Sequence, residues 1–136
     1  MIDGGLRSIF ASNLRRGFHW QAIESGGTNR GIPDANACSG GIEFWVEYKK
    51  TNGNGVPLRP EQVGWIERRV RAGGRVFVAI RLLKNNRDTL LLFHGKFVRP
   101  LYLSGLKVAK PLGEWEGGPS SWNWDEVSSL LRSVKF

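Results

Sequence analysis

The sequence contains a single cysteine, Cys38, and no long apolar segment. One cysteine cannot form an internal disulfide, and it cannot by itself supply a cysteine-based zinc site. No stretch approaches the roughly 18 apolar residues of a membrane span, and the N-terminus lacks the apolar core of a signal peptide. We therefore expect a cytoplasmic protein without membrane contact, in which any bound metal is held by oxygen atoms.

The chain is also poor in negative charge relative to positive charge. Twenty Lys and Arg residues stand against twelve Asp and Glu residues, which gives a formal net charge of +8 and a sequence pI near 10.3. Such an excess favours a polyanionic partner, and the lack of a basic amphipathic helix argues against a membrane surface. A length of 136 residues fits one domain over residues 1–136. Nucleic acid is thus the expected partner.

Hydrophobic periodicity predicts three helices and five strands. Apolar residues recur at helical spacing in Leu6–Leu14, after Pro60 up to the Gly73-Gly74 stop, and in Asp125–Val134 behind a capping Asn123. Segments rich in β-branched and aromatic residues predict strands over 18–23, up to Cys38, and over 42–49, 75–83 and 89–93. After Gly95 the pattern weakens. The order predicts an α/β fold with a central mixed β-sheet flanked by helices.

Three polar side chains are expected to converge around the strand 42–49. Side chains alternate along a strand, so Glu47 and Lys49 share one face. If the preceding segment pairs with this strand through the Ser39-Gly41 turn, Asp34 lies near Glu47. Carboxylate oxygens are the ligands that Mg²⁺ prefers. An ordinary solvated ion pair between Glu47 and Lys49 is the alternative interpretation when the two residues are taken alone.

The spacing of these residues resembles the signature of the PD-(D/E)XK nuclease superfamily. The signature is carried by Ile32-Pro33-Asp34 and Val46-Glu47-Tyr48-Lys49. Further segments over about residues 3 to 80 are similar to archaeal-type Holliday junction resolvases and to virus-type replication-repair nucleases: Gly17-Phe18, Ser25-Gly26, Leu58 to Gln62 and Ala72 to Val78. The resemblance implies a restriction-endonuclease-like core and a Mg²⁺-dependent DNA endonuclease that selects branched DNA, with a phage origin as a further expectation.

The resemblance also implies roles for individual residues. Asp34 and Glu47 would bind Mg²⁺, which Mn²⁺ would replace, together with the backbone carbonyl of Tyr48. Lys49 would position the attacking water, and Gln62 would lie beside the catalytic face. Ser25 would belong to a loop that approaches the DNA backbone, and the enzyme would act as a homodimer.

The resembled families carry a further acidic residue, for which this sequence offers two candidates. Asp3 precedes the first predicted helix and Glu24 follows the first predicted strand, and the sequence does not decide between them. Basic residues around the expected site are predicted to contact DNA: Arg30, Lys50 and Arg59. Alternative functions are a catalytically silent nuclease fold that binds nucleic acid, a restriction-type enzyme that reads a specific sequence, and a nuclease acting on RNA.

Overall fold

The chain folds around one mixed β-sheet whose strands lie in sequence order. The computed structural model describes residues 2–24 and 31–136. The six strands are β1 (His19–Ala22), β2 (Ala35–Ser39), β3 (Ile42–Thr51), β4 (Val76–Lys84), β5 (Arg87–His94) and β6 (Gly113–Trp115). Among the described strands only β3 and β4 pair in parallel, and helix α2 (Pro60–Arg71) forms the crossover between them. The mixed sheet predicted from the sequence is confirmed.

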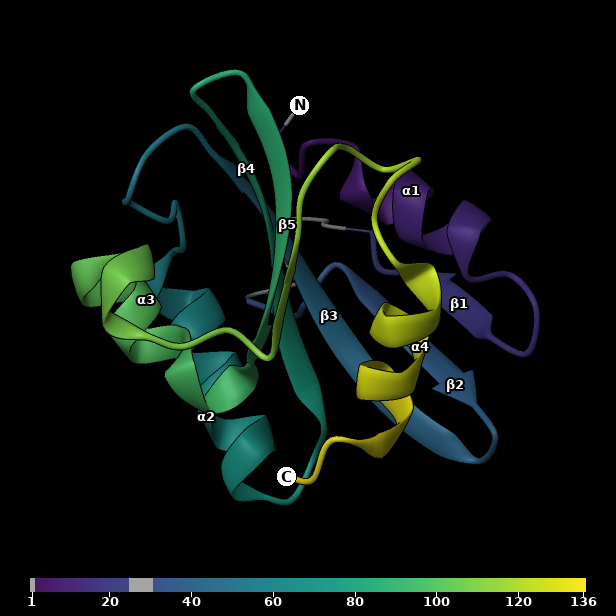
Figure 1. Ribbon diagram of the computed structural model, residues 1–136. Helices are drawn as coiled ribbons and strands as arrows, with labels where there is room; N and C mark the ends of the chain where they lie inside the picture. Colours follow the sequence, from purple (N-terminus) through teal and green to yellow (C-terminus); the bar gives the residue numbers. More distant parts are fainter. Residues whose placement is uncertain (1, 25–30) are drawn as a thin grey trace.

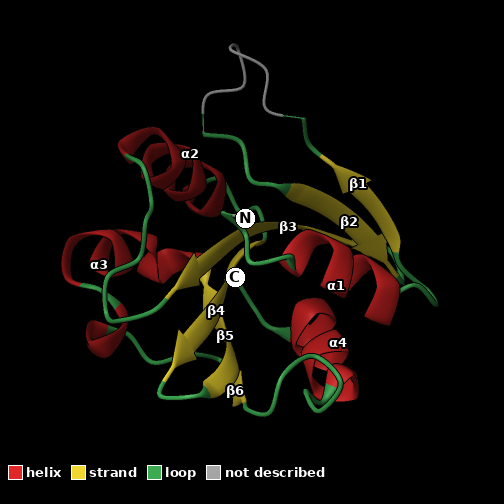
Figure 2. Cartoon of the chain, turned by 90° about the horizontal axis from the view of Figure 1, so that it is seen from above, coloured by secondary structure: helices red, strands yellow, loops and turns green. Residues whose placement is uncertain are grey.

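Helices cover the sheet on both faces. Helices α1 (Leu6–Asn13) and α4 (Trp124–Ser133) pack on one face, whereas α2 and α3 (Val98–Ser104) pack on the other, as Figures 1 and 2 show. Each face buries its own apolar cluster, with Phe10 and Phe44 in the first and Ile66 and Leu101 in the second. No helix within residues 2–24 and 31–136 is long and apolar enough to cross a membrane.

Two tight turns fix the registers of the antiparallel pairs. Gly40 and Gly41 join β2 to β3 with φ values of 57° and 80°, and Asn85 and Asn86 join β4 to β5 with 55° and 59°. Positive φ at both central residues is the conformation of a type I′ turn, which matches the twist of a two-stranded hairpin. Glycine and asparagine adopt it at low cost. Ser39 consequently pairs with Ile42.

Helix α2 begins and ends where the sequence predicted. Pro60 occupies its first turn, and the Gln62 side chain accepts a hydrogen bond from the Arg59 backbone N–H at 2.9 Å. Gly73, with a φ of 96°, follows the helix end. At α4, the Asn123 side chain accepts a hydrogen bond from Glu126 N at 3.1 Å, which confirms the predicted cap.

The segment after Gly95 holds structure that the sequence did not predict. It contains the short helix η1 (Gly95–Phe97), α3, the short helix η2 (Leu106–Val108) and the edge strand β6. The other predicted elements are present with shifted ends. Strand β3 extends to Thr51, and α1 ends at Asn13. Shifts of one or two residues are usual at element ends.

Candidate active site

The alternation of side chains along β3 creates the candidate site. Val46 and Tyr48 point into the apolar cluster under α1 and α4, whereas Glu47 and Lys49 point to the face covered by α2. Both charged side chains are buried, with Glu47 1% exposed and Lys49 4% exposed. Buried charges are rare unless they are paired. Their burial sets them apart from an ordinary solvated strand face.

Asp34 reaches the same place through the β2–β3 hairpin. Ala35 pairs with Val46, and the Asp34 Oδ2 oxygen accepts a hydrogen bond from the Tyr48 backbone N–H at 2.9 Å. The segment before Asp34 is held against α2 at Gly31. A Cβ atom at Gly31 would lie 2.0 Å from the backbone oxygen of Glu61, so only glycine allows this approach. Asp34 therefore sits between strand β3 and the start of α2.

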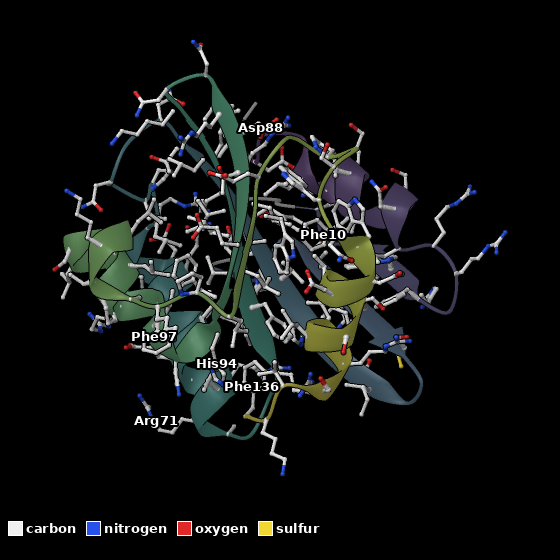
Figure 3. All side chains as sticks on the ribbon, viewed as in Figure 1. Phe10, Arg71, Asp88, His94, Phe97 and Phe136 are labelled. Atoms are coloured by element: carbon white, nitrogen blue, oxygen red, sulfur yellow. The ribbon has the colours of Figure 1, made fainter. Side chains whose placement is uncertain are left out.

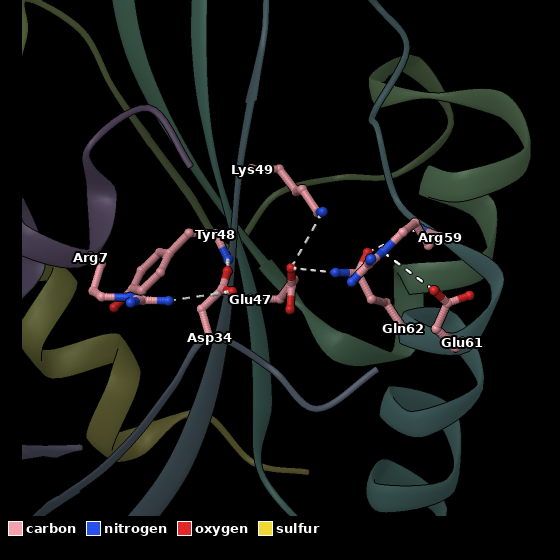
Figure 4. A network of polar contacts seen from close by, with 8 residues as sticks. All are labelled: Arg7, Asp34, Glu47, Tyr48, Lys49, Arg59, Glu61 and Gln62. Atoms are coloured by element: carbon pink, nitrogen blue, oxygen red, sulfur yellow. Dashed lines mark hydrogen bonds and ion pairs between the residues drawn. The ribbon is translucent and has the colours of Figure 1, made fainter. Parts of the chain in front are cut away.

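Gln62 connects the start of α2 to Glu47 (Figure 4). Its Nε2 atom donates a hydrogen bond to Glu47 Oε2 at 3.1 Å, while its Oε1 atom accepts from Arg59 N. Lys49 Nζ lies 3.5 Å from the same Glu47 oxygen. Gln62 thus caps the helix and orients the carboxylate at once. Its predicted position beside Glu47 agrees with the structure.

The surroundings of Glu47 disfavour its charged form unless a further positive charge lies beside it. Burial and the nearby Asp34 charge raise the pKa of Glu47 to about 8, although Lys49 opposes this rise. The Glu47 Oε1 oxygen is buried and accepts no hydrogen bond within the described part of the chain. Two carboxylates with one unsatisfied buried oxygen form a donor set that a hard divalent cation fits. Asp34 and Glu47 are the side chains that would hold Mg²⁺.

A cavity of about 630 Å³ surrounds these groups. The residues that line it come from five segments of the chain: Ile2, Asp3, Arg7, Ile23, Ile32, Asp34, Glu47, Tyr48, Lys49, Pro57, Arg59 and Gln62. Asp3 lines the cavity, and its Oδ1 oxygen accepts a hydrogen bond from Gly5 N at 2.9 Å. Glu24 is exposed and does not line the cavity. Within residues 2–24 and 31–136, no three His, Cys, Asp or Glu side chains are grouped to hold a metal.

The predicted DNA-contacting residues are found in different settings. Arg59 lines the cavity and lies 3.4 Å from the exposed Glu61 carboxylate. Lys50 is half-buried next to Gly4. Ser25 and Arg30 lie outside the described residues.

The sequence analysis missed Arg7. Its Nη2 atom lies 3.8 Å from Asp34 Oδ1, and its Nε atom is buried without a hydrogen-bond partner among the described residues. Arg7 follows Leu6 and precedes Phe10, the two fully buried residues of α1. A helical projection places Arg7 beside that buried stripe, but it does not indicate the contact with Asp34.

Comparisons with known proteins give one family and one group of similar structures. The family model described as archaeal Holliday junction resolvase (Hjc) matches residues 14–101. A solved structure of Hjc from Archaeoglobus fulgidus, a Holliday junction resolvase from an archaeal hyperthermophile, is similar with a TM-score of 0.51 and 18% identity. The match covers 90% of this chain and 96% of that chain. Comparison with curated protein sequences gives no match. The structural likeness concerns the fold.

Proposed function

The chain belongs to the archaeal Holliday junction resolvase family of the PD-(D/E)XK nuclease superfamily, and on this premise we propose that it is a Mg²⁺-dependent endonuclease that cuts branched DNA. Resolvases of this family are nucleases. The observation that carries the proposal for this chain is the meeting of Asp34, buried Glu47 and buried Lys49 at one cavity. The net charge of +8 supports a DNA substrate.

We assign metal binding to Asp34, Glu47 and the backbone carbonyl of Tyr48. When bound there, Mg²⁺ supplies positive charge that stabilises the phosphate as it gains negative charge during attack by water. Asp3, which lines the cavity, is our choice for the additional acidic residue over the exposed Glu24. Mn²⁺ would occupy the same oxygen site.

The remaining residues orient and hold the reacting groups. The Lys49 ammonium is kept near Glu47 by the 3.5 Å ion pair, where it would hold a water or a phosphate oxygen. Gln62 keeps Glu47 in one orientation through its amide donor, and the capping bond to Arg59 N fixes Gln62 itself. Arg59 at the cavity rim would contact a phosphate. The family resemblance implies a homodimer, and we propose that this chain also acts as a homodimer.

A cleavage assay with four labelled DNA substrates tests the proposal. A four-way junction, a flap, a linear duplex and a single strand would be incubated with Mg²⁺ or with EDTA, in both cases with equal enzyme. We expect Mg²⁺-dependent cutting that is fastest on the four-way junction. Binding without cutting of any substrate would favour the catalytically silent module. Equal cutting of every duplex, or cutting at one sequence only, would contradict selection of branched structure.

A further inference from the structure

The segment between β5 and β6 carries basic charge without any acid. Residues 95–113 contain Lys96, Arg99, Lys107 and Lys110 and no Asp or Glu. This segment includes η1, α3 and η2, which lie on the same face of the sheet as α2 (Figure 1). A surface segment of positive charge repels other cations and attracts a polyanion.

Two lysines of this segment are available to a partner. Lys107 and Lys110 are both exposed, and neither side chain forms an ion pair within the described residues. Arg99 differs, because its guanidinium donates to Glu67 at 2.7 Å and 2.8 Å. We call Lys107, which lies in η2, and Lys110, which follows η2, the lysine surface. Its two positive charges are not neutralised by the protein.

The lysine surface is fixed to the loop that follows the catalytic strand. The Asn54 backbone oxygen accepts from Leu106 N at 2.9 Å, and its side-chain oxygen accepts from Lys107 N at 2.9 Å. The Asn54 amide donates to Ser104 O at 3.0 Å. Gly105, with a φ of 84°, lets the two segments meet, because a Cβ there would lie 2.4 Å from Asn54 atoms. One asparagine therefore holds η2 by two hydrogen bonds and the end of α3 by a third.

The same loop leads directly to the cavity. It leaves β3 after Thr51, passes Asn54 and reaches Pro57 and Arg59, which line the cavity. Val56 and Leu58 are buried in the apolar cluster beneath α2 and α3 and hold the loop down. The loop 51–59 thus connects the lysine surface to the cavity through hydrogen bonds at Asn54 and buried apolar contacts.

We propose that the lysine surface binds the phosphate backbone of a duplex DNA arm that extends from the cavity over the loop 51–59. This inference rests on the proposed function and adds to it a second contact region. Charge complementarity favours DNA as the partner over another protein chain. The apolar residues Leu103 and Val108 nearby are 68% and 53% exposed and would be the contacts of a protein partner. An apolar contact between two copies would have to bury both lysine charges, which is costly without acidic partners.

Equilibrium binding in EDTA tests the lysine surface without cleavage. Fluorescence anisotropy would follow a labelled four-way junction over a series of salt concentrations for the wild type and the double variant Lys107→Ala/Lys110→Ala. The matched control is Arg15→Ala/Arg16→Ala, two exposed residues just after α1 on the opposite side of the sheet (Figure 1). We expect the lysine variant to lower the slope of log affinity against log salt by about 0.9 for each lost contact, and the control to leave it unchanged.

Three results would overturn the inference. The first is an unchanged DNA affinity and salt slope for the lysine variant. The second is a loss of affinity in the arginine control that equals the loss in the lysine variant. The third is a change in sedimentation mass for Leu103→Ser/Val108→Ser while the lysine variant binds DNA normally. The last result would assign the surface to a contact between chains. Because cleavage is not measured, the outcome is independent of whether the wild type cuts DNA.

Discussion

At the scale of single residues, the candidate site is a small set of buried charges held by few hydrogen bonds. Glu47 receives one donor from Gln62 and one ion pair from Lys49, and its second oxygen has none among the described residues. A buried unpaired acceptor costs about 1–3 kcal/mol. Such an arrangement destabilises the free protein and favours a cation, which is typical of a site shaped for binding rather than for stability.

Neutralising the metal ligands should separate binding from cleavage. Asp34→Asn and Glu47→Gln each replace a carboxyl group that would bind the metal with an amide of nearly the same volume. We expect cleavage of a four-way junction to fall by at least about 100-fold, because charge stabilisation of the phosphate is lost. DNA binding should be equal or stronger, since less negative charge faces the backbone. Single-turnover cleavage and anisotropy with the same junction would measure both.

Glu114→Gln provides the matched control for these variants. Glu114 is an exposed acid on β6, far from the cavity-lining segments in sequence, and its loss changes the net charge equally. The control should cut at the wild-type rate. Activity kept within a few-fold by both Asp34→Asn and Glu47→Gln would reject the proposed metal ligands.

Residue patterns in the sequence predicted the centre of the site better than its rim. Asp34, Glu47 and Lys49 could be placed because strand alternation and one hairpin determine their positions, whereas Gln62 was named from the family resemblance. Arg7 was missed because its contact with Asp34 depends on how α1 packs on the sheet. Packing between elements distant in sequence is not written in local periodicity.

At the scale of elements, the dependence on packing between distant parts of the chain explains why the structure after Gly95 was not predicted. Helix α2 was predictable from its Pro60 start, apolar spacing and glycine stop. Helix α3 has seven residues with Pro100 inside, and η2 and β6 have three residues each. Such short elements have little intrinsic stability. The η2 backbone donates hydrogen bonds to Asn54, and β6 pairs with β5, and these contacts hold η2 and β6 in place.

The C-terminal segment is docked by a histidine and an arginine. Figure 3 shows Phe136 beside His94, and the two rings stack with centroids 3.8 Å apart. His94 Nδ1 accepts from Lys96 N at 3.0 Å, so Nε2 carries the proton and donates to Lys135 O at 3.2 Å. Arg75 donates to the carbonyl oxygens of Leu131 and Val134 at the end of α4. The neutral form of His94 is therefore the one that fits.

This docking should contribute stability that is lost in mild acid. Burial is the main cause that lowers the pKa of His94 below its ordinary value of 6.5, with Lys96 and Arg75 as neighbouring positive charges. The unfolded chain therefore binds a proton more readily than the folded one. The stabilisation is complete above about pH 6.5 and is lost as the pH falls below it. Urea unfolding between pH 8 and pH 5 would measure the decrease when all variants carry Glu47→Gln, because the raised pKa of Glu47 otherwise changes the free energy of unfolding in the opposite direction.

Comparison of two histidine variants tests that assignment. His94→Gln should be less stable than wild type at pH 8 and should show a weaker decrease with acid. His19→Gln removes the other histidine, an exposed residue of β1, and should keep the wild-type decrease. If the two variants show the same pH dependence, His94 is not the group responsible.

At the scale of the whole molecule, the cavity exists only when distant parts of the chain come together. Its walls come from the N-terminal segment, the approach to β2, strand β3 and the start of α2. A cation held there binds the folded state and not the unfolded chain. By mass action, binding then raises the free energy of unfolding.

Mg²⁺ should consequently stabilise the fold through Glu47. At a concentration about 100 times the dissociation constant, one site contributes about 2.7 kcal/mol. We expect the Tm of the wild type to rise with Mg²⁺ concentration in calorimetry without DNA, and Glu47→Gln to lose this rise. Glu114→Gln should retain it. An equal rise in Glu47→Gln and wild type would place the cation elsewhere on the molecule.

The two-residue turn at Gly40-Gly41 has a consequence for the evolution of such chains. The buried Ala35 and Ala37 hold β2 on one face, while Asp34 and Glu47 depend on the register of the hairpin. A single inserted residue would shift β2 by one position and exchange its two faces. Two inserted residues would preserve them. Natural length variation between the two acids should therefore occur in pairs, and the parity of their separation should be inherited even where the hairpin sequence diverges.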